Sequence, residues 1–235
     1  MSELRGLYNA QPGFKTTYWD RSRLHDVLNR NYHVYKKYFV PQRGKGPPPA
    51  SGAPPGASAL VEFEELINSP NTREVELQAF LEAHPSFLTG ISGGVSEVFS
   101  SPLLVLDEER HIRPDFLLRP ALGDRWSIVE LKSPMAPPLT HYRGRGRPSR
   151  QLLDAAAQLR MYREYFRSRA SRAEVKRSFG SDIYEPRLVM LVGRGDAKPE
   201  EFAHLRSEIP EIEIVSYEDI LQFAKERLKS EGPTA

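Results

Sequence analysis

The sequence predicts an α/β protein in which helices flank a mixed β-sheet. Stretches with apolar residues at helical spacing alternate along the chain with short runs rich in β-branched and aromatic residues. Two of these short runs, around 116–118 and 125–131, are separated only by a turn-forming stretch and therefore indicate a hairpin. A chain of 235 residues with 39% hydrophobic content and a mean hydropathy of −0.52 suits a soluble globular protein with a polar extension. We therefore expect one ordinary domain with an appendage.

The composition excludes several classes of protein. The chain has no cysteine, which rules out disulfides, zinc–thiolate sites and thiol catalysis and agrees with the cytoplasmic location that we expect. No segment approaches the ~20 apolar residues of a membrane span, and the N-terminus has no signal-peptide core, so we expect no membrane association. The net charge of +2 does not by itself indicate nucleic acid, so any such signal must come from how the charge is distributed.

The chain divides into an arm, a linker and a domain. Residues 1–40 are polar but rich in aromatic residues, and we expect an arm that docks on its own domain; an oligomerisation or regulatory arm is the alternative. Residues 41–58 consist largely of Gly, Pro, Ala and Ser, which predicts a flexible linker. The domain is expected over 59–230, followed by a short tail at 231–235.

Local signals place the elements of the domain in order. Asn71 with Glu74 three residues later has the pattern of a capping box and predicts a helix that ends near Ala83, before Pro85. Ser149 is expected to cap a long helix. The remaining predicted segments are a β segment at 97–105, a hairpin at 112–132, a loop at 133–148, strands at 187–192 and 211–216, and helices at 199–207 and 217–229.

The hairpin carries the most informative residues. Side chains alternate along a strand, so Glu130 and Lys132 share a face. If the strands pair about the turn at 119–124, residues whose numbers sum to 245 lie opposite each other, and Asp115 falls opposite Glu130. Their Cβ atoms would then lie roughly 5 Å apart. Two carboxylates at that distance repel unless a cation or a proton joins them, and a divalent ion with oxygen ligands is the natural partner.

The alternative interpretation of Asp115, Glu130 and Lys132 is a surface ion pair at the strand ends. However, Glu130 and Lys132 interrupt an otherwise apolar strand, and charges that face a core are costly without a partner or a role. We therefore favour a functional site.

Pro114-Asp115, a turn and then Glu130-Leu131-Lys132 resemble the core of the PD-(D/E)xK nucleases. The resemblance implies a restriction-endonuclease-like core in which Asp115 and Glu130 hold Mg²⁺ or Mn²⁺ with the backbone carbonyl of Leu131. It also implies that Lys132 positions or activates the attacking water.

Further segments extend the resemblance. Glu76 stands in a helix similar to the family's first helix, which carries another acid, and is a further candidate metal ligand and catalytic residue. Gln158 stands in a helix similar to the one that follows the lysine strand, where its expected role is to contact Lys132, the water or the phosphate. The alternative interpretation of Glu76 is an acid favoured at the start of a helix, and that of Gln158 is an exposed polar position on a helix surface. The ordered set resembles the Shedu-type nuclease domain of bacterial anti-phage defence, which implies homo-oligomers.

A basic loop follows the lysine strand. Four arginines alternate with glycine and other small residues, so guanidinium groups would reach phosphates from a pliable backbone. The alternative is a solvated basic loop. The candidate nucleic-acid-binding residues are Tyr142, Arg143, Arg145, Arg147 and Arg150.

These observations predict an Mg²⁺-dependent DNA endonuclease that acts on phage or plasmid DNA in anti-phage defence. A catalytically silent nucleic-acid-binding or interaction module on the same fold is the alternative. An RNA substrate and an exonuclease mode stay open.

Overall fold

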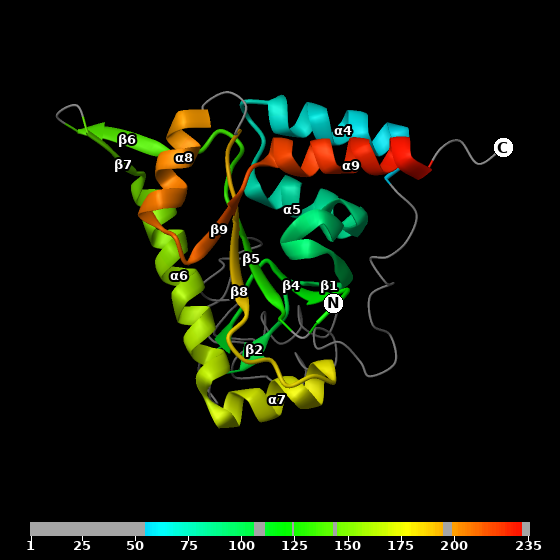
Figure 1. Ribbon diagram of the computed structural model, residues 1–235, viewed down its shortest axis with the longest axis vertical. Coiled ribbons are helices and arrows are strands. Elements are labelled where there is room, and N and C mark those ends of the chain that lie inside the picture. The colour runs from blue at the N-terminus through cyan, green and yellow to red at the C-terminus, as the bar shows by residue number, and fades with distance from the viewer. Residues whose placement is uncertain (1–54, 106–110, 124, 143–144, 195–198, 232–235) are drawn as a thin grey trace, which may run out of the picture. The chain divides into compact units, whose positions relative to one another are not determined.

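The computed structural model describes residues 55–105, 111–123, 125–142, 145–194 and 199–231 (Figure 1). The predicted N-terminal arm, most of the linker and all but the first residue of the tail lie outside the described residues. Helix α4 begins at Ala57, inside the expected linker, and extends to Asn68.

A five-stranded mixed sheet lies at the centre, which confirms the predicted fold class. Its strand order is β1-β4-β5-β8-β9. The β1–β4 and β4–β5 pairs are antiparallel, whereas β5–β8 and β8–β9 are parallel. The strand bounds are Val95–Ser100 for β1, Phe116–Pro120 for β4, Ser127–Leu131 for β5, Arg187–Leu191 for β8 and Ile212–Val215 for β9.

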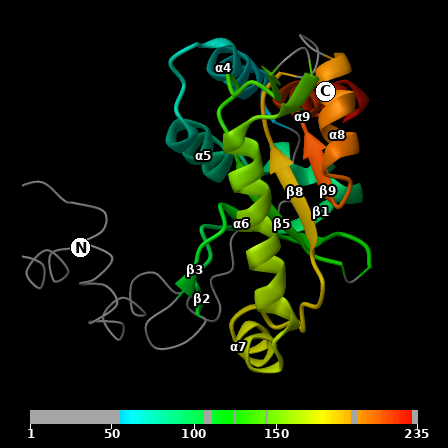
Figure 2. The same cartoon turned by 90° about the vertical axis from the view of Figure 1, so that its left-hand side faces the viewer.

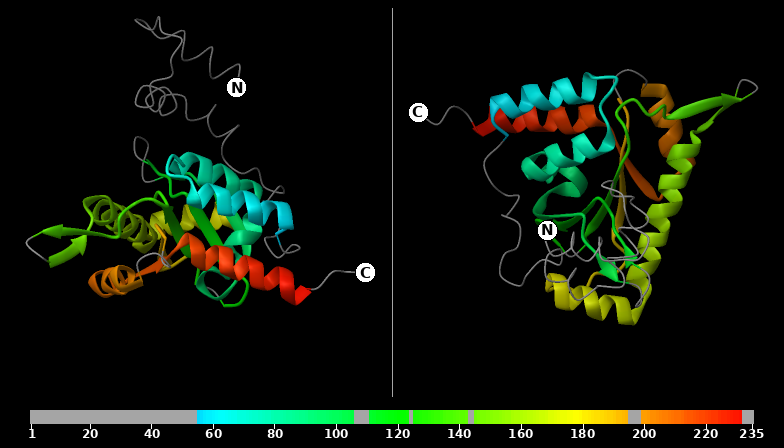
Figure 3. Two further views of the ribbon diagram at one scale, coloured as in Figure 1. Left: turned by 90° about the horizontal axis from the view of Figure 1, so that it is seen from above. Right: turned by 180° about the vertical axis from the view of Figure 1, so that it is seen from behind.

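Helices cover both faces of this sheet, and the views in Figures 1, 2 and 3 agree on the arrangement. One face carries α4, α5 (Glu74–Ala83), the 3₁₀ segment η1 (Pro85–Gly93) and α9 (Tyr217–Glu231). The other face carries α6 (Arg150–Arg167) and α8 (Pro199–Glu208), and α7 (Arg169–Phe179) follows α6. The two parallel connections therefore cross over through helices, as parallel strands require.

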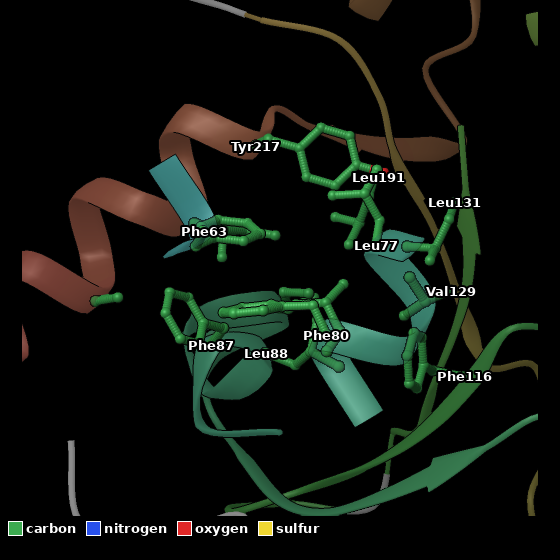
Figure 4. Close-up of a cluster of buried hydrophobic side chains, with 14 of the residues drawn as sticks. Phe63, Leu77, Phe80, Phe87, Leu88, Phe116, Val129, Leu131, Leu191 and Tyr217 are labelled. Carbon is green, nitrogen blue, oxygen red and sulfur yellow. The ribbon is translucent and has the colours of Figure 1, made fainter. Parts of the chain in front are cut away.

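One hydrophobic cluster of the core lies between the sheet and the α4, α5 and α9 layer. Val129 and Leu131 of β5 point into this layer, where Phe63 packs 4.8 Å from Phe87 between ring centroids (Figure 4). Every residue of β5 is buried, as expected for a central strand covered on both sides. Alternation then turns Glu130 to the opposite face, on which α6 lies.

Three predicted segments differ from the structure. The β segment at 97–105 is divided, because Ser101 adopts a positive φ of 44° directly after β1. The expected loop at 133–148 contains an antiparallel ribbon of β6 (Leu139–Tyr142) and β7 (Arg145–Pro148). Ser149 stands at the N-cap of α6, but its side chain makes no capping hydrogen bond.

A separate compact unit contains the short antiparallel pair of β2 (Leu104–Val105) and β3 (His111–Ile112). In the part of the chain that the structure describes, no helix combines the length and apolar character needed to cross a membrane.

Candidate functional site

The hairpin brings Asp115 to the end of β5 in the predicted register. The observed pairs Phe116–Val129, Leu117–Ile128 and Leu118–Ser127 all have residue numbers that sum to 245. Asp115 directly precedes β4, and its Oδ2 accepts a hydrogen bond of 2.7 Å from the backbone N–H of Leu131. This bond fixes the carboxylate at the strand end, beside Glu130.

Glu130 is a buried acid inside an apolar strand. Its side chain is 6% exposed, and its Oε1 lies 3.0 Å from Nζ of Lys132. Its other oxygen, Oε2, is buried and has no hydrogen-bond partner among the described residues. A buried carboxylate oxygen without a partner is costly, which makes this atom the best candidate in the site for an additional ligand contact.

The structure brings Glu74, rather than Glu76, to this group. Oε2 of Glu74 lies 3.6 Å from Nζ of Lys132, and its Oε1 accepts a 3.3 Å hydrogen bond from Nε2 of Gln151 at the start of α6. The carboxylate of Glu76 is instead engaged by Arg73, accepting 2.9 Å bonds from the backbone N–H and from Nη2. The expected roles are therefore exchanged: Glu76 closes the helix cap with Arg73 as N-cap, and Glu74 points to Lys132.

Gln158 reaches the site through Tyr162. Its Nε2 donates to Oη of Tyr162, whose hydroxyl lies 3.4 Å from the carbonyl oxygen of Arg113. Tyr162 is buried, and desolvation, together with the charges of Glu130 and Asp115, raises its pKa to about 12, although the bond from Gln158 acts in the opposite direction. Tyr162 thus remains a neutral hydroxyl near the carboxylates. The sequence shows it only as one residue of a helical stripe.

Tyr217 supports Lys132 from the opposite layer. Its hydroxyl donates a 2.6 Å hydrogen bond to the backbone carbonyl of Lys132, and its ring lies beside Leu77 and Leu191 (Figure 4). Burial raises its pKa well above the usual value, so the hydroxyl keeps its proton. This support was missed by the sequence analysis because nothing local links position 217 to position 132.

Burial and like charge control the titration of the two carboxylates. Desolvation, followed by the charge of Asp115, raises the pKa of Glu130 to about 7. Desolvation also raises the pKa of Asp115, against the lowering effect of the Leu131 N–H. For Lys132, burial acts to lower the pKa, but the carboxylates of Glu130, Glu74 and Asp115 raise it overall, so the amine stays charged. The site therefore favours a proton or another cation between its acids.

This donor set fits a divalent cation with oxygen ligands. Asp115 and Glu130 supply two adjacent carboxylates, and the buried Oε2 of Glu130 has no hydrogen-bond partner among the described residues. The side chain of Leu131 is in the core and its N–H is bonded to Asp115, so its carbonyl stays a predicted ligand. Among the described residues, no group of three or more His, Cys, Asp or Glu side chains converges as a metal cluster. Two carboxylates completed by carbonyl, water and substrate oxygens suit Mg²⁺.

The predicted nucleic-acid-binding residues belong to the β6–β7 ribbon and the start of α6. Arg147 is exposed, and the Arg150 side chain is 95% exposed with its Nε 3.9 Å from Asp154. Tyr142 and Arg145 pair across the ribbon, but their side chains, and all of Arg143, are outside the described residues. By contrast, Arg160 and Arg167 on α6 form ion pairs with Glu211 and with Glu164 and Glu185, as surface charges commonly do.

The fold and the site define an α/β domain with a buried carboxylate–lysine centre at the end of a central strand. Residues 71–221 match the family model described as Shedu protein SduA, C-terminal, which covers more than half of the chain, and the chain therefore belongs to the Shedu family. The match includes every site residue from Glu74 to Tyr217. Family membership suggests a role in anti-phage defence. A search of the curated proteins found no match.

Proposed function

We propose that this chain is a metal-dependent DNA endonuclease of the PD-(D/E)xK type, with a cytoplasmic role in defence against phage or plasmid DNA and a homo-oligomeric assembly. The observation that carries the proposal is the position of Asp115, directly before β4 and bonded to the N–H of Leu131, beside Glu130 of β5, with Nζ of Lys132 3.0 Å from Oε1 of Glu130. An ordinary surface ion pair would not leave Oε2 of Glu130 buried without a hydrogen-bond partner.

In this proposal, Asp115, Glu130 and the Leu131 carbonyl hold Mg²⁺ or Mn²⁺. When bound, such an ion polarises a phosphoryl oxygen and lowers the pKa of a coordinated water. Lys132 stays protonated beside three carboxylates, so it stabilises negative charge that develops on the phosphate and orients the water. Glu130 and Glu74 keep the amine in place, at 3.0 and 3.6 Å.

Three further side chains position the reacting groups. Tyr217 fixes the backbone of Lys132 through the carbonyl hydrogen bond of 2.6 Å. Gln151 restrains Glu74 through a bond of 3.3 Å. Gln158 and Tyr162 present a neutral amide and a neutral hydroxyl on the α6 side, where they can donate to a phosphate oxygen or a water.

The test is cleavage of supercoiled plasmid and of linear duplex DNA with Mg²⁺, with Mn²⁺ and with EDTA, in the wild type and in Lys132→Ala. We expect cutting that needs the metal and falls by at least about 100-fold in the variant, because charge stabilisation of this kind contributes on that order. Lys225→Ala is the matched control, since Lys225 lies on α9 and its Nζ pairs with Glu64 at 3.1 Å.

Metal-dependent cutting that is lost in Lys132→Ala and kept in Lys225→Ala supports the nuclease. Cutting that is equal in all three proteins, or that continues in EDTA, contradicts it. The product pattern separates endonuclease from exonuclease action, because only an endonuclease nicks or linearises the closed plasmid.

The alternative is a catalytically silent nucleic-acid-binding module. It is favoured because no group of three or more His, Cys, Asp or Glu side chains that could hold a metal ion is found in the described part of the chain. This alternative predicts DNA binding that is unchanged by Lys132→Ala and no cutting with either metal.

A further inference from the structure

The β6–β7 ribbon projects from the body of the domain. Figures 1 and 3 show its two strands starting beside α8 and extending away from the sheet, at the end of the molecule where α6 begins. The strands are short and antiparallel, with Leu139 paired to Pro148, Thr140 to Arg147 and His141 to Gly146. A two-stranded ribbon of this kind has two distinct faces.

The domain covers the base of one face of the ribbon. Leu139 and Pro148 are buried at its base. A Cβ at Gly146 would come within 2.9 Å of Cδ1 of Leu139 and 3.9 Å of Cδ2 of His204 on α8, so this side lies against the helix. The paired positions Thr140 and Arg147 alternate with these residues and are exposed. Solvent therefore meets the Thr140–Arg147 face.

The ribbon and the start of α6 are strongly basic, although the chain as a whole is nearly neutral. Residues 139–150 contain four arginines and no acid, against a net charge of +2 for all 235 residues. Arg147 has no ion pair among the described residues, and Arg150 has only the 3.9 Å contact with Asp154, which is weak at such exposure. A surface with this charge attracts a polyanion.

The dimensions of the ribbon discriminate between polyanions. Four residues in each strand, at about 3.3 Å a residue, give a reach of roughly 13 Å. The major groove of B-form DNA is about 12 Å wide and 8.5 Å deep and admits a two-stranded β-ribbon. The major groove of A-form RNA is deep and narrow, and side chains cannot read it. The ribbon is therefore suited to duplex DNA and not to duplex RNA.

The base of the ribbon is anchored to the candidate site. The N–H of Ser149 bonds to the carbonyl of Pro138 at 3.3 Å and closes the ribbon where β7 runs into α6. Two residues later, Gln151 contacts Glu74, which in turn lies beside Lys132. A groove held by the ribbon would thus be fixed relative to the carboxylates.

We propose that the β6–β7 ribbon enters the major groove of B-form duplex DNA with its Thr140–Arg147 face. This inference rests on the proposed function, whose substrate it specifies: the nuclease takes duplex DNA and holds it by a groove contact on the ribbon. Arg147 contacts the phosphates that border the groove, and Thr140 lies directly across the ribbon from it.

The test measures binding of the full chain to short fluorescent duplex DNA, duplex RNA and single-stranded DNA, in EDTA and at several salt concentrations. The variants are Arg147→Ala and Thr140→Glu. The matched controls are Arg169→Ala and Ala157→Glu, which make the same changes at exposed positions on α7 and α6. Thermal unfolding of each variant checks the fold.

We expect both ribbon variants to weaken duplex DNA binding at least about fivefold, and Arg147→Ala to reduce the salt slope by about one. The controls should stay within about twofold of the wild type. Duplex RNA should bind much more weakly than duplex DNA. Equal affinity for the two duplexes, or unchanged affinity in both ribbon variants, overturns the inference. If Thr140→Glu binds DNA normally but forms a smaller assembly than the wild type in light scattering, the inference is overturned, and the ribbon instead pairs with another copy of the chain.

Cleavage assays on the same proteins separate this inference from the proposed function. If the wild type cuts DNA with Mg²⁺ and the ribbon variants bind and cut normally, the groove contact is wrong and the nuclease stands. If the ribbon variants lose duplex binding while the wild type does not cut with either metal, the groove contact stands and the catalytic proposal fails.

Discussion

At the scale of single residues, Glu130 dominates the behaviour of the site. It occupies a position in β5 that an apolar residue would fill at lower cost, and burial raises its pKa from the usual 4.5 to about 7. The folded protein without metal therefore binds a proton that the unfolded chain has released between about pH 4.5 and 7. The chain thus keeps a costly carboxyl in its interior, which agrees with the ligand contact that we propose for it.

This shift predicts a pH dependence of stability in EDTA. Because the native state binds more protons, the free energy of unfolding falls as the pH rises from about 4.5 through 7, by on the order of 3 kcal/mol from this group. The raised pKa of Asp115 acts in the same direction. Urea unfolding at several pH values should show that Glu130→Gln removes most of this loss and is more stable than the wild type at pH 8. A loss of equal size in the variant would contradict the assignment.

The exchange of Glu74 and Glu76 gives a second prediction at this scale. Glu74→Gln should lower Mg²⁺-dependent cleavage, because it removes a charge 3.6 Å from Nζ of Lys132, and should change stability little. Glu76→Gln should leave the rate of cleavage near that of the wild type, because the Glu76 carboxylate contacts Arg73. The backbone and side-chain bonds from Arg73 lower the pKa of Glu76, so its contribution to folding is lost as the pH falls through that lowered value. If Glu76→Gln lost cleavage activity and Glu74→Gln kept it, Glu76 rather than Glu74 would belong to the catalytic site.

The two glutamates also mark where sequence reasoning fails at a single residue. Asn71 and Glu74 have the spacing of a capping box, but Arg73 becomes the N-cap and Glu76 its partner. Asn is a common N-cap residue and Arg is not. The helix begins later because Leu77, Phe80 and Leu81 must face the core together, and this tertiary demand overrides the local capping preference.

At the scale of elements, the end of β5 is joined to the start of α9. The carbonyl of Lys132 accepts from Tyr217, and the N–H of Lys132 donates to Leu191 of β8 at 2.8 Å. The chain that carries the lysine is therefore fixed on both sides after the strand ends. The fully buried ring of Tyr217 packs with Phe63 of α4 in the same layer, at 6.3 Å between centroids.

We predict that Tyr217→Phe lowers the free energy of unfolding by about 1–3 kcal/mol, because it leaves a buried carbonyl without its donor. Cleavage should also fall, since the backbone of Lys132 is released while its side chain is unchanged. Tyr184→Phe is the control, because Tyr184 is 58% exposed. Equal stability and equal activity of the two variants, measured by urea unfolding and plasmid nicking, would show that the bond has no role.

Helix α6 and the β4–β5 hairpin were predictable from local patterns, whereas the β6–β7 ribbon was not. Leu152, Ala155, Ala156, Leu159 and Phe166 indicate α6, and all five are buried in the helix. The hairpin register followed from the turn length and the alternation of β4 and β5. The β6–β7 ribbon has the composition of a loop, with Gly146 and Pro148 inside a strand, and it depends on packing against α8 that no local pattern reveals.

At the scale of the whole molecule, the candidate site gathers positions that are far apart in the chain. Glu74 comes from α5, Asp115 and Lys132 from the hairpin, Gln151 from α6 and Tyr217 from α9. The sequence indicated the hairpin members because they are neighbours in one supersecondary unit. Gln151 lies within the first parallel crossover, Tyr217 follows the second, and Glu74 comes from α5 before the sheet begins, so no spacing along the sequence encodes their distances from the hairpin. The net charge of +2 likewise gives no indication of the basic β6–β7 ribbon, which contains no acidic residue.

The hydrogen bond between Tyr217 and Lys132 has a consequence for the synthesis of the protein on the ribosome. A ribosome delivers residue 132 long before residue 217, so a nascent chain holds the carboxylates and the lysine of the hairpin without the closing helix that secures them. Strands β8 and β9, which extend the sheet from β5, also emerge late. Under the proposed function, the catalytic centre would therefore be complete only after the chain has been synthesised beyond Tyr217.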